Sequence, residues 1–279
     1  MNNVAYFIAS YGKPNDMPTL KALQAVNVNY PVYIVIGTDD PKLDEYKQTF
    51  KGNLLVFDKA DYIDQIDDVG MYAKTHKVCT YSRLAITDFA KNLGIQYVVY
   101  LFDDINYFQL RYVNKDRKVG STRYFKLDKM IDMYIKLLNA SPDIYFVSAP
   151  QSSFYIGITA DRVDKYKYTV RNSNMLVYNV DKQPDVQRSS VLEDMDIVLS
   201  NNKVGKLSIC PFGLQVCCRD PHSTADCYGD MSISEYYQHF VLIDNRPVNI
   251  KCLSIPYKHF TPKIISDKYR RSINAKALI

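Results

Sequence analysis

Two adjacent carboxylates, Asp103 and Asp104, follow an unbroken apolar run over residues 97–102. A single acidic residue after a strand commonly caps the next turn. Two neighbouring acids repel each other, however, unless a cation lies between them and a ligand. Hard divalent cations prefer carboxylate oxygens and bring phosphate groups with them. The pair therefore predicts either an ordinary acidic turn or a manganese or magnesium site that binds a diphosphate.

The segments before this pair alternate between apolar strands and helices. Strands are predicted over residues 4–10, 31–37, 54–58 and 95–102, with helices over 20–27, 38–50 and 73–93 between them. Thr19 is placed to cap the first helix. This alternation is typical of a mostly parallel α/β sheet. In such sheets ligands bind at the carboxyl ends of the strands, where the acidic pair lies.

The second half of the chain is less regular. The pattern predicts helices over residues 127–140, 191–202 and 233–245, and strands over 144–150, 154–160, 174–180, 206–210 and 248–255. Residues 105–126 are rich in basic and aromatic side chains, for which a solvated loop is one interpretation, and the basic tail after residue 257 reads as partly irregular. We find no repeat, no low-complexity segment and no clear linker, which favours a single domain.

Composition limits the class of protein. The chain has 279 residues, 47% of them hydrophobic, and a formal net charge of +5. No apolar stretch approaches the ~20 residues that span a bilayer, so we expect no membrane partner. The first residues lack the pattern of a secretory leader. The six cysteines show no paired C-x-x-C spacing, which argues against a zinc site and a disulfide scaffold and favours a cytoplasmic protein.

Specific motifs resemble those of a known enzyme family. "RLAITDFAKNLGIQYVVYLFDDI" (83–105) resembles the segment that leads into the DxD motif of GT-A type glycosyltransferases. The stretch 4–111 resembles more closely the TET-associated glycosyltransferases of bacteriophages, through "IASYGKPNDMPTLKAL" (8–23), a helix containing Tyr46 after "VIGTDDP", and 81–108. The match departs from the family in "FDDIN", which is no full triple Asp, and in Lys13, where an Arg is usual.

The resemblance implies a fold and a division of the chain. It implies a GT-A (Rossmann-like) fold, with a mostly parallel sheet flanked by helices, in one domain over residues 1–279. Residues 1–111 would form the half that binds the nucleotide sugar. Residues 112–279 would form the half that binds the acceptor and would end in the basic tail. If the protein is phage-encoded, it would act in the host cytoplasm.

The resemblance also assigns roles to residues. Asp103 and Asp104 would bind manganese or magnesium, with His259 as a further ligand. "LEDMD" (192–196) resembles the acidic xED motif near the acceptor, so Asp194, with Glu193, would be the general base. An exposed acidic helix start and a packed histidine are the alternatives that the residues leave open. A nucleotide sugar, expected to be a UDP-sugar, would contact Ser10, Lys13, Asp39, Arg83, Asp103 and Asp104.

For the acceptor, the resemblance implies a hydroxymethylated pyrimidine, hydroxymethylcytosine, in phage DNA. A base modified within a duplex must be flipped out, which requires cations for phosphates and aromatic platforms. The DNA-binding candidates are Arg111, Arg117, Lys118, Arg123, Arg270 and Arg271. The alternatives are solvated basic segments, a glycosyltransferase of polysaccharide or envelope biosynthesis, and a non-catalytic module that binds nucleotide sugar or DNA. The sugar and the stereochemistry stay open.

Overall fold

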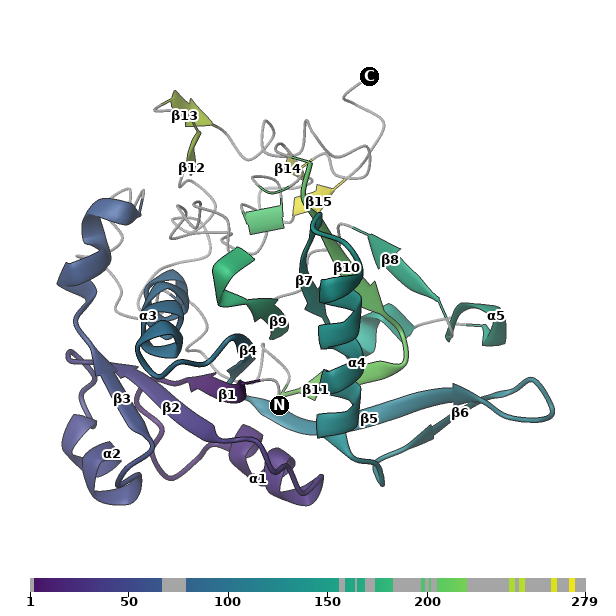
Figure 1. Ribbon diagram of the computed structural model, residues 1–279, viewed down its shortest axis with the longest axis horizontal. Helices are drawn as coiled ribbons and strands as arrows, with labels where there is room; N and C mark the ends of the chain where they lie inside the picture. The colour runs from purple at the N-terminus through teal and green to yellow at the C-terminus, as the bar shows by residue number, and fades with distance from the viewer. Residues whose placement is uncertain are drawn as a thin grey trace.

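The computed structural model describes most of residues 3–155 and the remainder of the chain in part (Figure 1). The described residues are 3–66, 79–155, 159–163, 165–168, 174–182, 197–198, 201, 205–219, 241–243, 246–248, 262–264 and 271–273.

The first half forms one side of a large sheet. Strands β1 (Val4–Ala9), β2 (Val32–Gly37), β3 (Leu54–Phe57) and β4 (Tyr97–Phe102) are all parallel, in the order β3-β2-β1-β4. Helices α1 (Pro18–Ala25), α2 (Leu43–Thr49) and α3 (Cys79–Asn92) connect them, with a 3₁₀ segment η1 (Lys59–Gln65) before α3. Gly94, with φ of 68°, ends the α3 connection. The predicted alternation of strands and helices is confirmed over residues 4–102.

The sheet continues beyond β4 in the order β4-β9-β7-β10-β8. The added strands are β7 (Ile144–Ser148), β8 (Tyr166–Tyr168), β9 (Met175–Asn179) and β10 (Leu207–Pro211). Strands β8 and β9 run antiparallel to their neighbours, and the other six run in one direction. Helix α4 (Leu127–Ala140) precedes β7, and the short segments are η2 (Ser152–Tyr155), α5 (Ala160–Val163) and η3 (Val180–Lys182).

Alternate residues of the central strands face two separate cores. In β1, Phe7 packs with Ala85 and Ile86 of α3, whereas Ile8 packs with residues of α1 and α4 on the opposite face. Because helices cover both faces, every residue of β1 is buried, which explains the continuous apolar runs of these strands. The predicted GT-A (Rossmann-like) fold class, a mostly parallel sheet flanked by helices, is confirmed.

A second, three-stranded sheet starts directly after the acidic pair. Strands β5 (Ile105–Val113) and β6 (Val119–Thr122) form an antiparallel hairpin, and β11 (Leu214–Cys218) pairs with the first part of β5. Residues 105–126, for which a solvated loop was one interpretation, therefore form mainly paired strands. Basic and aromatic residues occupy positions that would be apolar in an ordinary half-buried strand, so the strand signal was hidden. Figure 1 shows this hairpin extending away from the rest of the molecule.

Three other local predictions need correction. Residues 154–160 were predicted as a strand, but the described ones among them lie in η2, in α5 or directly before α5, since a short apolar run does not distinguish a strand from a helix. Residues 241–243 of the predicted helix 233–245 form strand β12 (Val241–Ile243), which pairs with β13 (Arg246–Val248). In the tail, β14 (Pro262–Ile264) pairs with β15 (Arg271–Ile273). The predicted helix over 191–202 lies almost wholly outside the described residues.

No helix within the described ranges is both long and apolar enough to cross a membrane.

Candidate active site

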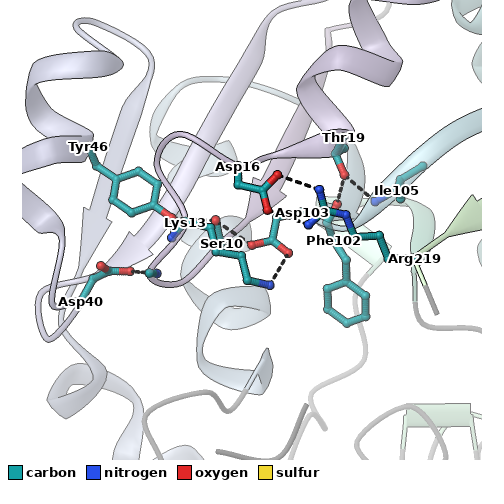
Figure 2. Close-up of polar contacts among 11 residues, drawn as sticks. Ser10, Lys13, Asp16, Thr19, Asp40, Tyr46, Phe102, Asp103, Ile105 and Arg219 are labelled. Carbon is teal, nitrogen blue, oxygen red and sulfur yellow. Dashed lines mark hydrogen bonds and ion pairs between the residues drawn. The ribbon is translucent and has the colours of Figure 1, made fainter. Parts of the chain in front are cut away.

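Asp103 and Asp104 form the short turn between β4 and β5, and Thr19 fixes both sides of it (Figure 2). The Thr19 hydroxyl donates to the carbonyl oxygen of Phe102 at 2.6 Å and accepts from the backbone N–H of Ile105 at 2.9 Å. The backbone N–H of Thr19 donates to the carbonyl of Asp103 at 3.3 Å. The predicted role of Thr19 as a helix cap is wrong, because α1 already begins at Pro18 and its cap position, Met17, offers no side-chain bond.

Asp103 is surrounded by hydrogen-bond donors. Ser10, at the end of the neighbouring strand β1, donates from Oγ to Asp103 Oδ2 at 2.8 Å. The Lys13 ammonium lies 3.9 Å from Asp103 Oδ1. Burial raises the pKa of Asp103, while Lys13, Ser10 and the backbone N–H of Tyr11 oppose that rise. Three residues that were predicted to contact the nucleotide sugar, Ser10, Lys13 and Asp103, therefore lie together at the carboxyl ends of β1 and β4.

Fewer groups offset the cost of burying the Asp104 carboxylate. Its Oδ1 is buried and has no hydrogen-bond partner among the residues that the structure describes. Burial and then repulsion from Asp103 raise the pKa of Asp104 to about 6. A buried carboxylate oxygen without a donor favours either protonation of the group or a bound cation. Asp103 and Asp104 thus differ in role, since Asp103 is held by the protein and Asp104 offers an unused oxygen.

Tyr46 anchors the loop that follows β1. Its hydroxyl lies 2.8 Å from Ser10 Oγ and accepts from the backbone N–H of Lys13 at 2.9 Å. Asp40 ties the same loop to the start of α2, because its carboxylate accepts from the backbone N–H groups of Gly12 and Lys42, each at 2.8 Å. The backbone that carries Ser10 and Lys13 is therefore held by contacts across two strand ends (Figure 2).

Asp39, at the end of β2, pairs with the buried Lys59, whose Nζ lies 2.7 Å from Asp39 Oδ2. The Lys59 ammonium also lies 5.6 Å from the centre of the Tyr11 ring. Gly37 leaves room for this arrangement, since a Cβ there would lie 2.4 Å from Asp39 Oδ1. The Asp39–Lys59 pair and Tyr11 form a polar wall beside the loop after β1. Sequence reasoning missed Lys59, which lies in an unremarkable 3₁₀ segment.

Arg83 is buried on the α3 face of β4, with 2% of its surface exposed. Its guanidinium carbon lies 5.0 Å from the centre of the Tyr100 ring and 5.9 Å from that of Phe102. It therefore packs beneath the last residues of the strand that ends at Asp103. Its predicted contact with a diphosphate stays a prediction.

Arg219 is a site residue that the sequence did not indicate. Its guanidinium makes two hydrogen bonds of 2.6 Å to the carboxylate of Asp16, in the loop after β1. Its backbone N–H donates to the carbonyl of Asp104 at 2.9 Å. These hydrogen bonds and the charge of Arg219 lower the pKa of Asp16, whereas for Asp104 the charge of Arg219 only opposes the rise in pKa. The two partners are 203 residues apart in the chain, so no local pattern could have paired them.

The basic candidates whose side chains the structure describes all lie on or beside the β5–β6 hairpin. Arg111 donates from Nε to Gln215 Oε1 at 2.6 Å and stacks 4.9 Å from the centre of the Tyr155 ring. The Arg123 guanidinium stacks on Tyr107, 3.5 Å from the ring centre. Arg117 and Lys118 lie exposed in the hairpin turn. The hairpin begins directly after the acidic pair, and its basic and aromatic side chains form a cationic surface that extends away from it.

Several predicted residues lie outside the described part of the chain: Glu193, Asp194, His259, Arg270 and the side chain of Arg271. Within the described part, no group of three or more His, Cys, Asp or Glu residues is arranged to bind a metal ion. Asp103 and Asp104 would thus supply two carboxylates, and other ligands would come from the substrate, water or the undescribed residues.

The chain was compared with protein families, curated proteins and solved structures. The family description "TET-Associated Glycosyltransferase" matches residues 4–212. A search of curated proteins finds no match to the chain. Among solved structures, a glucosyl-3-phosphoglycerate synthase from Mycobacterium tuberculosis, in complex with Mg²⁺ and uridine diphosphate, is 6% identical, with 98% of this chain and 87% of that chain covered and a TM-score of 0.47. A CMP:2-keto-3-deoxy-manno-octonic acid synthetase complexed with CTP is 11% identical, with 79% and 92% covered and a TM-score of 0.40.

Proposed function

Because the chain belongs to the TET-associated glycosyltransferase family, we propose that it transfers a sugar from a nucleotide sugar to hydroxymethylcytosine, a hydroxymethylated pyrimidine, in DNA. The observation that carries the proposal is the pair Asp103–Asp104 at the carboxyl end of β4. One carboxylate of the pair is held by the protein, and the other has an unpaired buried oxygen. The family match includes this pair and the whole donor side of the sheet. DNA and nucleotide sugars meet in the cytoplasm of a bacterial host, where this reaction would take place.

A divalent cation fits the acidic turn. Asp104 Oδ1 is a buried oxygen to which no described residue donates, and the adjacent charge of Asp103 makes ionisation of both groups costly. Manganese or magnesium bound by Asp104 and Asp103 would remove that repulsion, because both ions prefer oxygen ligands. We propose His259 as a further ligand. When bound, the cation would stabilise the negative charge of the departing nucleoside diphosphate.

The loop after β1 and the end of β2 are suited to the donor. Lys13 places a positive charge at the edge of the acidic turn, where it can face a phosphate. Ser10 orients Asp103 through its hydroxyl. Asp39, held by Lys59 beside the Tyr11 ring, offers a carboxylate to sugar hydroxyl groups of a nucleoside, which we expect to be uridine. Arg83, which is buried on the α3 face of β4, would contact the diphosphate.

In the reaction we assign, the bond between the anomeric carbon and the diphosphate oxygen breaks. A new bond forms between that carbon and the hydroxymethyl oxygen of the base. We propose that Asp194, with Glu193 beside it, takes the proton from this hydroxyl group. The basic residues of the β5–β6 hairpin and Arg270 and Arg271 of the tail would hold the DNA backbone.

The direct test incubates the protein with duplex DNA that contains hydroxymethylcytosine, with unmodified DNA, and with a panel of nucleotide sugars. Mass spectrometry of the digested nucleosides then reports donor and acceptor together. We expect a glycosylated nucleoside from the hydroxymethylated DNA and none from the unmodified DNA. One nucleotide sugar should give clearly more product than the others. Transfer to a lipid or glycan acceptor, with none to DNA, would assign the enzyme to envelope biosynthesis instead.

A further inference from the structure

The outer part of the β5–β6 hairpin, residues 111–122, extends beyond the sheet from which it starts. We call this segment the arm. Pairing of β5 with β11 ends at Leu110, and the last backbone contact on that side runs from the N–H of Arg111 to the carbonyl of Gly213 at 2.7 Å. From Tyr112 to Ser121 the two strands pair with each other, and no third described strand joins them. Figure 1 shows the arm projecting from the body of the molecule.

Local contacts give the arm a defined shape. Two-stranded ribbons are marginally stable by themselves, so such contacts are needed. At its tip, Asn114 closes the turn, because its N–H donates to the Lys118 carbonyl at 2.9 Å and its side chain accepts from the Lys118 N–H at 2.8 Å. Along the ribbon, the Tyr112 ring lies across Gly120, where a Cβ would come within 2.7 Å of the ring. The arm is therefore a preformed ribbon.

Residues 105–126, which include the arm, account for the net positive charge of the whole protein. Residues 105–126 contain six basic residues and one acidic residue, Asp116. The full chain has 35 basic and 30 acidic residues, so the remainder contains 29 of each and is neutral. At the tip, Lys115, Arg117 and Lys118 are exposed, and none of them pairs with a carboxylate in the described part of the chain. A projecting, cationic surface on a neutral body indicates a polyanionic partner.

We infer that the arm lies in the major groove of duplex DNA, with Lys115, Arg117 and Lys118 on the backbone phosphates. This inference rests on the proposed function for the identity of the polyanion. The major groove, about 12 Å wide, admits a two-stranded β-ribbon. The arm begins a few residues after Asp104, and a strand rises about 3.3 Å per residue, so its tip lies roughly 30 Å from the acidic pair. That distance is about one helical turn of DNA, with half-site spacings near 34 Å.

The test compares two triple variants that lose the same charge. Lys115→Gln/Arg117→Gln/Lys118→Gln neutralises the tip. Lys51→Gln/Lys129→Gln/Lys136→Gln neutralises three exposed lysines on other elements and serves as the control. Binding of a 30-base-pair duplex (about three turns) that contains hydroxymethylcytosine is measured by fluorescence anisotropy over a salt series. Thermal unfolding of each variant confirms that the fold is intact.

We expect the tip variant to bind about 10–100-fold more weakly at moderate salt, and the slope of log Kd against log salt to fall by about 2 to 3. The control should bind like the native protein. On a short duplex that extends less than about 10 base pairs (one turn) beyond the target on either side, the tip variant and the control should bind with nearly equal affinity. Equal binding by the two triple variants would overturn the inference. So would equally tight, equally tip-dependent binding of single-stranded DNA or double-stranded RNA.

The outcomes separate this inference from the proposed function. If sugar reaches hydroxymethylated DNA and the tip variant behaves as the control, the function stands and the arm has no role in binding. If the tip variant loses duplex binding but no nucleotide sugar is ever transferred to DNA, the arm binds DNA and the proposed reaction is wrong.

Discussion

Ser10 and Asp103 are 93 residues apart in the chain, and Ser10 Oγ donates a 2.8 Å hydrogen bond to Asp103 Oδ2. The contact exists because β1 and β4 are parallel neighbours, with Ala9 opposite Phe102, so both strands end at the same level. It engages one oxygen of Asp103, whereas Asp104 Oδ1 has no such donor. The two adjacent acids are thereby made unequal, and the predictions below follow from that inequality and from the contacts around it.

Asp104→Asn should abolish sugar transfer, by at least about 100-fold, without unfolding the protein. The change keeps the size of the side chain but removes the charge that would hold a cation opposite the diphosphate, a contribution to catalysis of several kcal/mol. Transfer measured by mass spectrometry of nucleosides checks it. Asp44→Asn, an exposed acid on α2, is the matched control and should retain native activity. Native turnover by the Asp104 variant would remove the acidic pair from the mechanism.

The same variant should alter the pH dependence of stability. The folded protein raises the pKa of Asp104 from 3.8 to about 6, so it binds that proton more tightly than the unfolded chain. This contribution to stability is fully present below pH ~4 and is lost as the pH rises through ~6. Without metal, Asp104→Asn should therefore be more stable than the native protein at pH 7.5, by roughly 2 kcal/mol, and equal to it near pH 4. Urea unfolding at several pH values measures the difference, and a constant difference would contradict it.

Manganese should raise the unfolding temperature of the native protein at pH 7.5 and have little effect at pH 5. Protonation of Asp104 competes with the metal, because a divalent ion requires the ionised carboxylate. The Asp104→Asn protein should show a much smaller shift at both pH values. Differential scanning fluorimetry with and without a chelator provides the measurement. Equal stabilisation of both proteins by manganese would place the ion elsewhere.

Thr19→Val should destabilise the protein by about 2–3 kcal/mol, since two buried backbone groups, the Phe102 carbonyl and the Ile105 N–H, lose their hydroxyl partner. Thr19→Ser should restore most of the stability. Thr49→Val, which removes an exposed hydroxyl bonded to the Glu45 carbonyl, is the control and should cost less than about 0.5 kcal/mol. Similar free energies of unfolding for both valine variants would show that Thr19 does not secure the acidic turn.

Arg219→Gln should impair the enzyme more than it destabilises the fold. The Arg219–Asp16 pair is partly exposed, and such pairs contribute about 0–1 kcal/mol. It nevertheless holds the loop that carries Ser10 and Lys13 against the backbone of Asp104. We expect a several-fold higher KM for the nucleotide sugar with an almost unchanged unfolding temperature. Lys206→Gln, which breaks the exposed pair with Asp143, should change neither quantity. A large loss of stability without a change in KM would make the pair purely structural.

The sequence determined the central sheet and the place of the acidic pair within it. Strands β1 and β4 are buried on both faces, so their continuous apolar runs are visible locally, and the helices between the first four strands imply that these strands are parallel. The amphipathic pattern of α4 fits its observed bounds, Leu127–Ala140, because one face meets the sheet. An acid at the end of such a strand lies at the ligand-binding edge, and this also follows from chain order.

Only the tertiary structure decided how the two acids differ and what holds them. Thr19, Ser10, Lys59 and Arg219 act through partners 20 to 203 residues away, and hydrogen bonds over such separations leave no local periodicity. The hairpin was missed for a related reason. Arginine side chains that stack on aromatic rings occupy positions where a half-buried strand would usually be apolar. The sequence therefore shows that the segment is basic but gives no strand pattern. Charge and composition are properties of residues, whereas pairing, burial and the inequality of Asp103 and Asp104 arise only when distant strands are brought side by side.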